Sequence, residues 1–422
     1  MSSDWQLTTL GEICTEQGGA IQTGPFGSQL HTSDYKEVGI PVVMPTNIGD
    51  GGIVEDGIAR IDQSDVDRLS QHKLMLNDIV FSRRGDVTKN ALIREHEVGW
   101  FCGTGCLKVR LGAERIANPK FISHCLRLPD TKDWLVRHAV GATMPNLNTG
   151  ILSAVPINLP PISVQREIAA MLGSLDDRIT LLRETNTTLE AIAQALFKSW
   201  FVDFDPVHAK MQGRAPEGMD QATAALFPDS FEDSELGPVP KGWKIGSMSD
   251  LCVIASGKRP TDRSDLPSDN CNIPLYGGAG LMGYTAESLF DDKKIVTGRV
   301  GTLGRVHVAY PPCWASDNVL VLSPRDEIFF SFSLQWLREI DVHALNRGST
   351  QPLLTQKDLG AQTGVIPHRA LLQKFEEIST VLNGQIRLQT LQVETLTNLR
   401  DILLPRLISG ELHVSTSEGD AA

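Results

Sequence analysis

The stretch LPPISVQREIAAMLGSLDDRITLL, residues 159–182, decides the fold, because a Pro-Pro pair precedes a long run with apolar residues at helical spacing. A similar stretch, IPHRALLQKFEEISTVLNGQIRLQ, occupies residues 366–389. In both, apolar residues recur at intervals of three and four, which is the spacing of a coiled-coil seam. The seam residues are Ile168, Met171, Leu175, Ile179 or Leu182, Leu189, Ile192 and Leu196 in the first helix, and Phe375, Ile378, Leu382, Ile386, Leu396, Leu399 and Leu403 in the second.

The first predicted helix runs to about Trp200, so its roughly 40 residues span about 60 Å. A helix of that length with one apolar stripe needs a partner. The second copy is the simplest partner, and the chain order then makes the pair antiparallel. The alternative is two separate surface helices, each packed on its own domain, but the stripe is too long for a domain of roughly 150 residues to cover.

Outside the helices the chain also repeats itself, in the same order. The matching stretches are WQLTTLGEIC (5–14) with WKIGSMSDLC (243–252), DIVFSRRGDVTKNALI (78–93) with KIVTGRVGTLGRVHVA (294–309), and GATMPNL (141–147) with GSTQPLL (348–354). The repeat predicts two units, each a mixed domain followed by a long helix, related by an approximate two-fold axis.

Within each mixed domain, short β-like runs are broken by Gly, Pro, Asn and Asp, which predicts an α+β fold with irregular loops. We therefore expect two similar α+β domains separated by a pair of long antiparallel helices in a coiled coil. The expected boundaries are a first mixed domain at 1–158, a central helix region at 159–204, an acidic linker at 205–240, a second mixed domain at 241–366, a C-terminal helix region at 367–412 and a flexible tail at 413–422.

Charge is distributed unevenly along the chain. The formal net charge of -12 argues against binding nucleic acid through bulk charge. However, residues 201–240 alone carry a net charge of -6. The stretch 82–94 carries four basic residues and one acid, and the stretch 293–305 carries four basic residues and no acid. These two basic islands predict local contacts with a polyanion.

Several classes of protein are disfavoured by what the sequence lacks. It has no long apolar run and no signal-peptide pattern, so we expect neither a membrane span nor secretion. Seven cysteines without framework spacing suggest reduced thiols in a cytoplasmic protein, and the pair in CGTGC (102–106) has no companion that would complete a metal site. There is no Walker phosphate loop, amino-methyltransferase loop or nuclease constellation, and the glycines at 278–283 lack a βαβ context. We therefore expect a non-catalytic protein without a cofactor or metal of its own.

Seven motifs together carry a family resemblance. They are IQTGPFGSQL (21–30), DIVFSRRGDV (78–87), GATMPNLN (141–148), LPPISVQREIA (159–169), ALFKSWFVDFDPV (195–207), LFPDSFEDSELGPVPKGW (226–243) and LRDILLPRLISGEL (399–412). In this order and over nearly the whole chain, the sequence resembles the specificity subunit of type I restriction–modification enzymes. The second helix entry, IPHRALLQKF, departs from the first because it lacks Pro-Pro and Gln-Arg.

The resemblance implies that each mixed domain is a target recognition domain that reads one half of a bipartite site in double-stranded DNA. The helices would hold a fixed spacer and dock two modification (methyltransferase) subunits, and restriction (translocase–nuclease) subunits would join that core. S-adenosylmethionine, ATP and Mg are then expected on the partner subunits, with none on this chain. The rival interpretation is a non-catalytic scaffold that bridges two partner proteins without reading DNA.

Loop residues supply the candidate DNA contacts. They are Gln22, Thr23, Ser28, Arg83, Arg84, Thr88, Lys89, Thr143, Asn146, Asn148, Arg299, Thr302, Arg305, Ser349, Thr350 and Gln351. Because Arg83 and Arg299 match between two domains that should read different sequences, a phosphate or structural role is favoured for them over base reading. The other polar residues are equally compatible with ordinary turn formation. For Phe26, a small core plug is favoured over an aromatic residue at the DNA surface.

Overall fold

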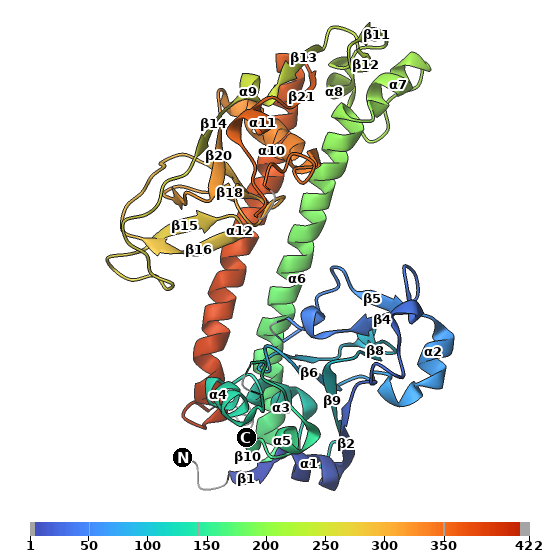
Figure 1. Ribbon diagram of the computed structural model, residues 1–422, viewed down its shortest axis with the longest axis vertical. Helices are drawn as coiled ribbons and strands as arrows, with labels where there is room; N and C mark the ends of the chain where they lie inside the picture. Colours follow the sequence, from blue (N-terminus) through green and yellow to red (C-terminus); the bar gives the residue numbers. More distant parts are fainter. Residues whose placement is uncertain (1–4, 50, 142, 349–350, 414–422) are drawn as a thin grey trace, which may run out of the picture. The chain divides into compact units, whose positions relative to one another are not determined.

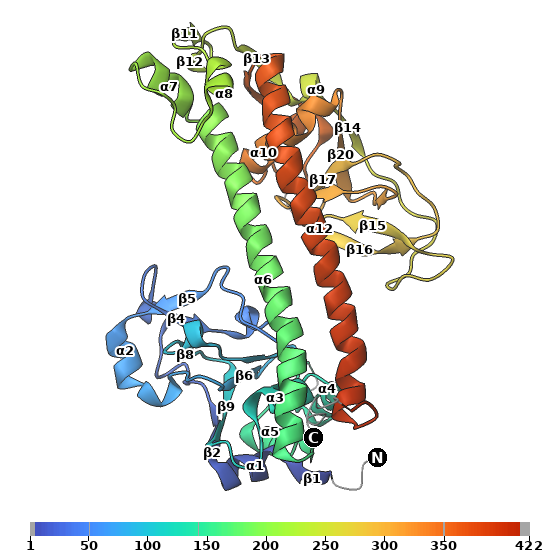
Figure 2. The same ribbon diagram turned by 180° about the vertical axis from the view of Figure 1, so that it is seen from behind.

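The computed structural model describes residues 5–49, 51–141, 143–348 and 351–413 (Figures 1 and 2). Internal contacts divide the chain into unit 1, residues 1–182 and 392–422, and unit 2, residues 183–391. The division falls inside the two long helices α6 (Ile162–Phe201) and α12 (Arg369–Ile408). Each unit therefore holds one mixed α+β domain and a part of both helices. Nearly all of the predicted flexible tail, residues 414–422, lies outside the described residues.

The mixed domain of unit 1 has two four-stranded sheets, in the orders β2-β9-β6-β7 and β3-β5-β4-β8, and a separate pair β1-β10. Its strands are β1 (Gln6–Thr9), β2 (Gly18–Thr23), β3 (Tyr35–Lys36), β4 (Ile40–Val43), β5 (Ala59–Ile61), β6 (Ile79–Ser82), β7 (Asn90–Leu92), β8 (Phe101–Cys102), β9 (Cys106–Gly112) and β10 (Pro156–Leu159). Its helices are α1 (Leu10–Gln17), α2 (Gln63–Arg68), α3 (Pro119–Cys125), α4 (Pro129–His138) and α5 (Thr149–Ser153).

The mixed domain of unit 2 repeats this plan in shorter form, with the sheets β14-β20-β17-β18 and β16-β15-β19 and the pair β13-β21. Its strands are β13 (Lys244–Ser247), β14 (Cys252–Ser256), β15 (Ile273–Gly277), β16 (Gly280–Thr285), β17 (Lys294–Gly298), β18 (Val306–Ala309), β19 (Trp314–Ala315), β20 (Val319–Pro324) and β21 (Thr363–Ile366). Its helices are α9 (Met248–Leu251), α10 (Phe330–Glu339) and α11 (Gln356–Gly360).

Strand register makes the two domains equivalent residue by residue. On β9, Leu107 lies between Thr23 of β2 and Phe81 of β6. On β20, Leu320 lies between Ser256 of β14 and Thr297 of β17 in the same way. Counting onward from these strands equates position 83 with position 299. The internal repeat and the α+β class that the sequence predicts are therefore confirmed.

The acidic segment between α6 and the second domain is folded. It contains α7 (Asp205–Met211), α8 (Gln221–Ala225) and the hairpin of β11 (Phe231–Ser234) with β12 (Gly237–Pro240). The Phe204 ring packs against Trp243 at 5.7 Å and against Phe231 at 6.0 Å between ring centroids. This segment therefore adds to the aromatic core of unit 2.

In each unit the long helices pair in antiparallel fashion. In unit 1, Ile168 of α6 shares a hydrophobic core with Ile408 of α12, and one charged pair joins Asp176 to Arg400. In unit 2, Asn186 of α6 donates a hydrogen bond to Thr390 of α12 at 3.3 Å. Residue numbers rise along α6 as they fall along α12, as the sequence predicts.

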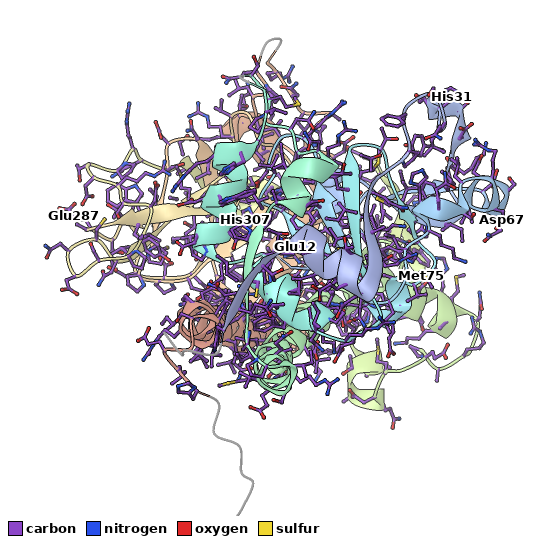
Figure 3. All side chains as sticks on the ribbon, turned by 90° about the horizontal axis from the view of Figure 1, so that it is seen from below. Glu12, His31, Asp67, Met75, Glu287 and His307 are labelled. Carbon is purple, nitrogen blue, oxygen red and sulfur yellow. The ribbon has the colours of Figure 1, made fainter. Side chains whose placement is uncertain are left out.

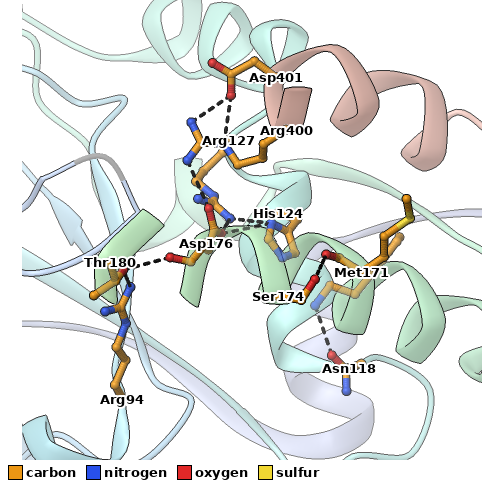
Figure 4. A network of polar contacts seen from close by, with 11 residues as sticks. Arg94, Asn118, His124, Arg127, Met171, Ser174, Asp176, Thr180, Arg400 and Asp401 are labelled. Atoms are coloured by element: carbon orange, nitrogen blue, oxygen red, sulfur yellow. Dashed lines mark hydrogen bonds and ion pairs between the residues drawn. The ribbon is translucent and has the colours of Figure 1, made fainter. Parts of the chain in front are cut away.

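A charged network ties α6 of unit 1 to its surroundings (Figure 4). The Asp176 carboxylate, 19% exposed, accepts from Arg127 Nη2 at 2.7 Å and from Arg400 Nη1 at 3.0 Å. Arg127 follows α3 and Arg400 belongs to α12, so one carboxylate joins three elements. His124 Nδ1 accepts from the Arg127 guanidinium, and burial lowers the pKa of His124 to about 3, which keeps it neutral. Burial opposes ionisation of Asp176, but the charges and hydrogen bonds of Arg127 and Arg400 hold its pKa below the ordinary value.

We expect Asp176→Ala to lower the free energy of unfolding by about 3–5 kcal/mol, because it leaves the buried guanidinium group of Arg127 without its carboxylate and removes one of the two carboxylates that pair with Arg400. Urea unfolding at neutral pH measures this, with Asp401→Ala as control, since the Asp401 side chain is 55% exposed. The folded-state pKa of Asp176 is lowered, so the difference should persist above about pH 4 and disappear on further acidification. Equal effects of the two substitutions would contradict this assignment.

Candidate nucleic-acid interface

In unit 1, several loops meet at one end of the sheet β2-β9-β6-β7. The chain leaving β2 is held where Gly24 N donates to Cys106 O at 2.9 Å. The chain leaving β6 is held where Arg83 N donates to Gly105 O at 2.9 Å. Because Gly105 and Cys106 are adjacent at the start of β9, the turn 24–30 and the basic loop 83–89 begin side by side.

The GATMPNLN stretch (141–148) is fastened to this basic loop by main-chain hydrogen bonds. Leu147 N donates to Arg83 O at 2.9 Å, and Gly85 N donates to Pro145 O at 3.2 Å. Gly85 has a φ of +78°, a conformation that favours glycine. Two motifs that are separate in sequence are therefore joined. We define the first recognition edge as the loops 24–30, 83–89 and 141–148, of which residue 142 lies outside the described part of the chain.

Unit 2 builds the same edge with the same bonds. Arg299 N donates to Asn318 O at 2.8 Å, Leu354 N donates to Arg299 O at 2.9 Å, and Gly301 N donates to Pro352 O at 3.1 Å. Each of these main-chain bonds has its counterpart at the matched position of unit 1. The second recognition edge consists of the loops 257–260, 299–305 and 348–355, of which residues 349–350 lie outside the described part of the chain.

The two matched arginines share an unusual feature. Among the residues that the structure describes, the Nε atoms of Arg83 and Arg299 are both buried and have no hydrogen-bond partner. Arg299 Nη1 does donate to Ser256 Oγ, at 3.2 Å. A buried donor without a partner is costly, and a phosphate oxygen is an acceptor suited to a guanidinium group. The phosphate or structural role that the sequence favours for this pair stays a prediction.

The remaining predicted contact residues fall into three groups. Thr88 and Asn148 are engaged locally: Thr88 Oγ1 donates to Asp86 at 2.7 Å, and Asn148 Oδ1 accepts from Ile151 N at 2.8 Å as the N-cap of α5. Ser349 and Thr350 lie outside the described residues. The others lie at or beside the recognition edges; Thr23 and Asn146 are half-buried, and the exposed ones are Gln22, Ser28, Arg84, Lys89, Thr143, Thr302, Arg305 and Gln351.

The prediction for Phe26 is wrong. Its side chain is 57% exposed rather than buried as a core plug. The neighbouring Leu30, only 3% exposed, fills the apolar site beneath this turn instead. A pattern of Gly-Pro-Phe-Gly in the sequence cannot distinguish which of two apolar residues turns inward.

Two polar residues of the second edge were missed in the sequence. Ser256 Oγ accepts from Arg299 and also from Gln356 Nε2, at 2.9 Å. Ser256 matches Thr23, which was a candidate, so extending the repeat by register would have found it. Gln356 directly follows Thr355, the N-cap of α11 and the counterpart of Asn148.

Gln165 of the first helix entry is buried and holds its own domain rather than facing outward. Its Oε1 accepts from Asn118 N at 2.9 Å, and its Nε2 donates to Ile116 O at 2.9 Å and to Pro160 O at 2.8 Å. In the second entry the matched residue is Leu372, and Glu376 accepts from Ser331 N at 2.7 Å. The two helix entries thus perform the same anchoring with different residues.

Features that would indicate other chemistry are not found in the described residues. No three His, Cys, Asp or Glu side chains gather there to hold a metal ion, and no helix there is long and apolar enough to cross a membrane. All seven cysteines are buried and free, and burial raises the pKa of Cys102 to about 12.

Comparison with known proteins identifies a family. The family model described as the type I restriction modification DNA specificity domain matches residues 2–191 and 240–384. The chain is 26% identical over 360 residues to the type I restriction enzyme HindI specificity subunit of Haemophilus influenzae, covering 70% of this chain and 78% of that protein. It is 26% identical over 318 residues to the MjaIX specificity subunit of Methanocaldococcus jannaschii, covering 70% and 69%.

The solved structure of a type I restriction–modification S subunit from M. genitalium has a similar fold, with a TM-score of 0.55 at 18% identity. The match covers 96% of this chain and 97% of that one. At this identity the likeness concerns the fold.

Asn148 and Thr355 occupy matched positions as the N-caps of α5 and α11. Asn148→Ala and Thr355→Ala should each lower the free energy of unfolding by about 1 kcal/mol, because each removes the acceptor for the first turn of a short helix. Thermal or urea unfolding of the full chain measures the loss. Thr143→Ala, at an exposed position in the same loop, serves as the control and should change stability little. An Asn148→Ala chain as stable as wild type would leave this residue without the assigned capping role.

Proposed function

Because the chain belongs to the type I restriction modification DNA specificity family, we propose that it is the DNA sequence-specificity subunit of a type I restriction–modification complex. Each mixed domain acts as a target recognition domain and reads one half of a bipartite site. The observation that carries this proposal is the pair of equivalent recognition edges, each with a basic loop pinned by the same main-chain bonds.

Electrostatics supports DNA as the ligand of these edges despite the net charge of -12. Half of that net charge falls in residues 201–240, outside both edges. The edges themselves present Arg84 and Lys89 in unit 1 and Arg305 in unit 2 to solvent. Basic side chains placed at matched loops favour DNA reading over the scaffold alternative, which gives no reason for their equivalence.

Catalysis belongs to other subunits in this proposal. Modification subunits, two per complex, carry S-adenosylmethionine, and restriction subunits carry ATP and Mg, while this chain holds no cofactor. The complex works in the cytoplasm, where it meets its DNA.

The long helices are proposed to set the spacer and to dock the modification subunits. Both expose large apolar side chains, which a helix in water leaves uncovered only at a cost. On α12 these are Val381, Leu388, Leu391, Leu399 and Ile402, and on α6 they are Met171, Leu181 and Ile192. Met171, Ile192 and Leu399 are therefore exposed rather than buried in the seam where the sequence places them. Spaced along the helices by about whole numbers of turns, they offer a partner helix an apolar face.

The function is tested by sequencing the methylated bases of a restriction-free host that expresses this chain with its modification subunits. We expect one split motif, with two specified halves separated by a fixed number of unspecified base pairs. A single contiguous motif would sink the two-domain arrangement, and methylation that does not depend on this chain would favour the scaffold.

A second test concerns the matched arginines. Arg83→Ala and Arg299→Ala should each weaken binding of the assembled complex to DNA of any sequence. Each should also reduce the slope of log K against log salt by about 1, as expected for one lost phosphate contact. Titrations at several salt concentrations measure the slope. Arg137→Ala, whose side chain is 76% exposed on α4 outside the edges, is the matched control. Unchanged slopes would assign both arginines to a purely structural role.

A further inference from the structure

The turn that follows β2 is rigid. Phe26 N donates to Gln29 Oε1 at 3.1 Å, and Gln29 N donates back to Phe26 O at 2.9 Å. Arg68 Nη1 clamps the far side by donating to Gln29 O at 3.0 Å. At the near side, Gly24 admits no side chain, because a Cβ there would lie 2.1 Å from Gly103 O. These contacts restrict the motion of the turn, so the side chains that it exposes stay exposed.

What the turn displays is an aromatic ring. Pro25 and Leu30 are buried, whereas Phe26 between them is 57% exposed. Residue His31, directly after the turn, lies at the rim of unit 1 (Figure 3). Moving a phenylalanine ring out of water lowers the free energy of the folded protein. A ring that a rigid turn holds in solvent therefore contributes little to folding. The turn starts beside the basic loop of the first recognition edge, which places the ring on that edge.

Unit 2 fixes the chain leaving β14 at the matched position, but it exposes a different side chain there. Gly257 N donates to Val319 O at 3.2 Å, as Gly24 does to Cys106, and a Cβ on Gly257 would lie 2.2 Å from Ser316 O. Trp314 Nε1 fixes the next residue by donating to Lys258 O at 2.7 Å. Two positions past the matched glycine, where unit 1 has Phe26, unit 2 exposes Arg259.

The repeat inside this chain separates shared roles from individual ones. Positions that keep the same residue in both edges, such as Arg83 with Arg299, serve what the two half-sites have in common, which is the DNA backbone. Other positions are matched by strand register but expose different side chains in the two units. Such positions serve what differs between the half-sites, which is the base sequence. Phe26 and Arg259 are such a pair.

We propose that the segments that follow β2 and β14 are base-reading elements, in which Phe26 packs against bases of one half-site and Arg259 contacts base edges of the other. This rests on the proposed DNA-recognition function. An exposed aromatic ring can stack on a base or wedge into a base step. An arginine can donate two hydrogen bonds to guanine O6 and N7 in the major groove.

The test uses the full chain with its modification subunits in a restriction-free host. Phe26→Ala should make at least one position of one half-motif degenerate, and Arg259→Ala should do so in the opposite half-motif. On duplexes that carry the wild-type motif, each variant complex should bind about 5- to 150-fold more weakly. Phe26→Trp keeps a stacking surface and should retain most of the affinity. Val38→Ala, at a side chain 84% exposed in the same domain, is the matched control and should change neither motif nor affinity.

Several outcomes would overturn the inference. The first is an unchanged motif and affinity for Phe26→Ala, and the second is that both variants change the same half-motif. The third is a lowered melting temperature of the Phe26→Ala chain, because this would give the ring a role in folding. If wild type itself shows no split motif, the proposed function fails instead. A split wild-type motif with unaltered variants refutes only the assignment of these turns.

Discussion

The sharing of one carboxylate by two buried arginines fixes how unit 1 is assembled. An apolar seam alone permits helices to slide by whole heptads, because one leucine pocket resembles the next. Displacing Asp176 would leave Arg127 buried without a carboxylate and would leave Arg400 with the more exposed Asp401, which costs far more than repacking a leucine. Since Arg127 belongs to the mixed domain and Arg400 to α12, the same contact sets both the helix register and the seat of the domain on α6.

The recognition edges follow a different principle, in which main-chain hydrogen bonds hold the loops and side chains stay available. In both units the bonds run between backbone atoms of the basic loop, the sheet and the loop before the long helix. Backbone bonds tolerate almost any side chain, apart from glycines such as Gly85 and Gly301 that adopt φ values of +78°. Exposed residues on such edges can therefore change without loss of the fold, which suits a protein whose target varies.

The features of the fold that depend on local periodicity or on repetition could be predicted from the sequence. The two long helices, the α+β repeat and the matched pair of arginines were visible because each leaves a pattern in neighbouring or duplicated residues. The structural role of Asp176 was not visible in the sequence. Within SLDDRIT this residue resembles a solvent-exposed charge, because its partners lie far away along the chain. The prediction for Phe26 failed for the same reason, because burial is decided by packing against distant segments. The anchoring role of Gln165 left no pattern in the sequence either.

The departure of the second helix entry from the first also has a physical meaning. Asp176 matches Asn383 in the second copy, and the aliphatic Leu404 and Ile408 match Phe197 and Phe201. These two rings pack on Phe375 at 6.0 Å and 5.1 Å between centroids. An aromatic cluster and a charged network cannot replace each other, since exchange would leave cavities on one side and unpaired charges on the other. Although the two halves of the chain resemble each other, each half of α6 therefore fits one segment of α12, and the repeated helices specify a single pairing.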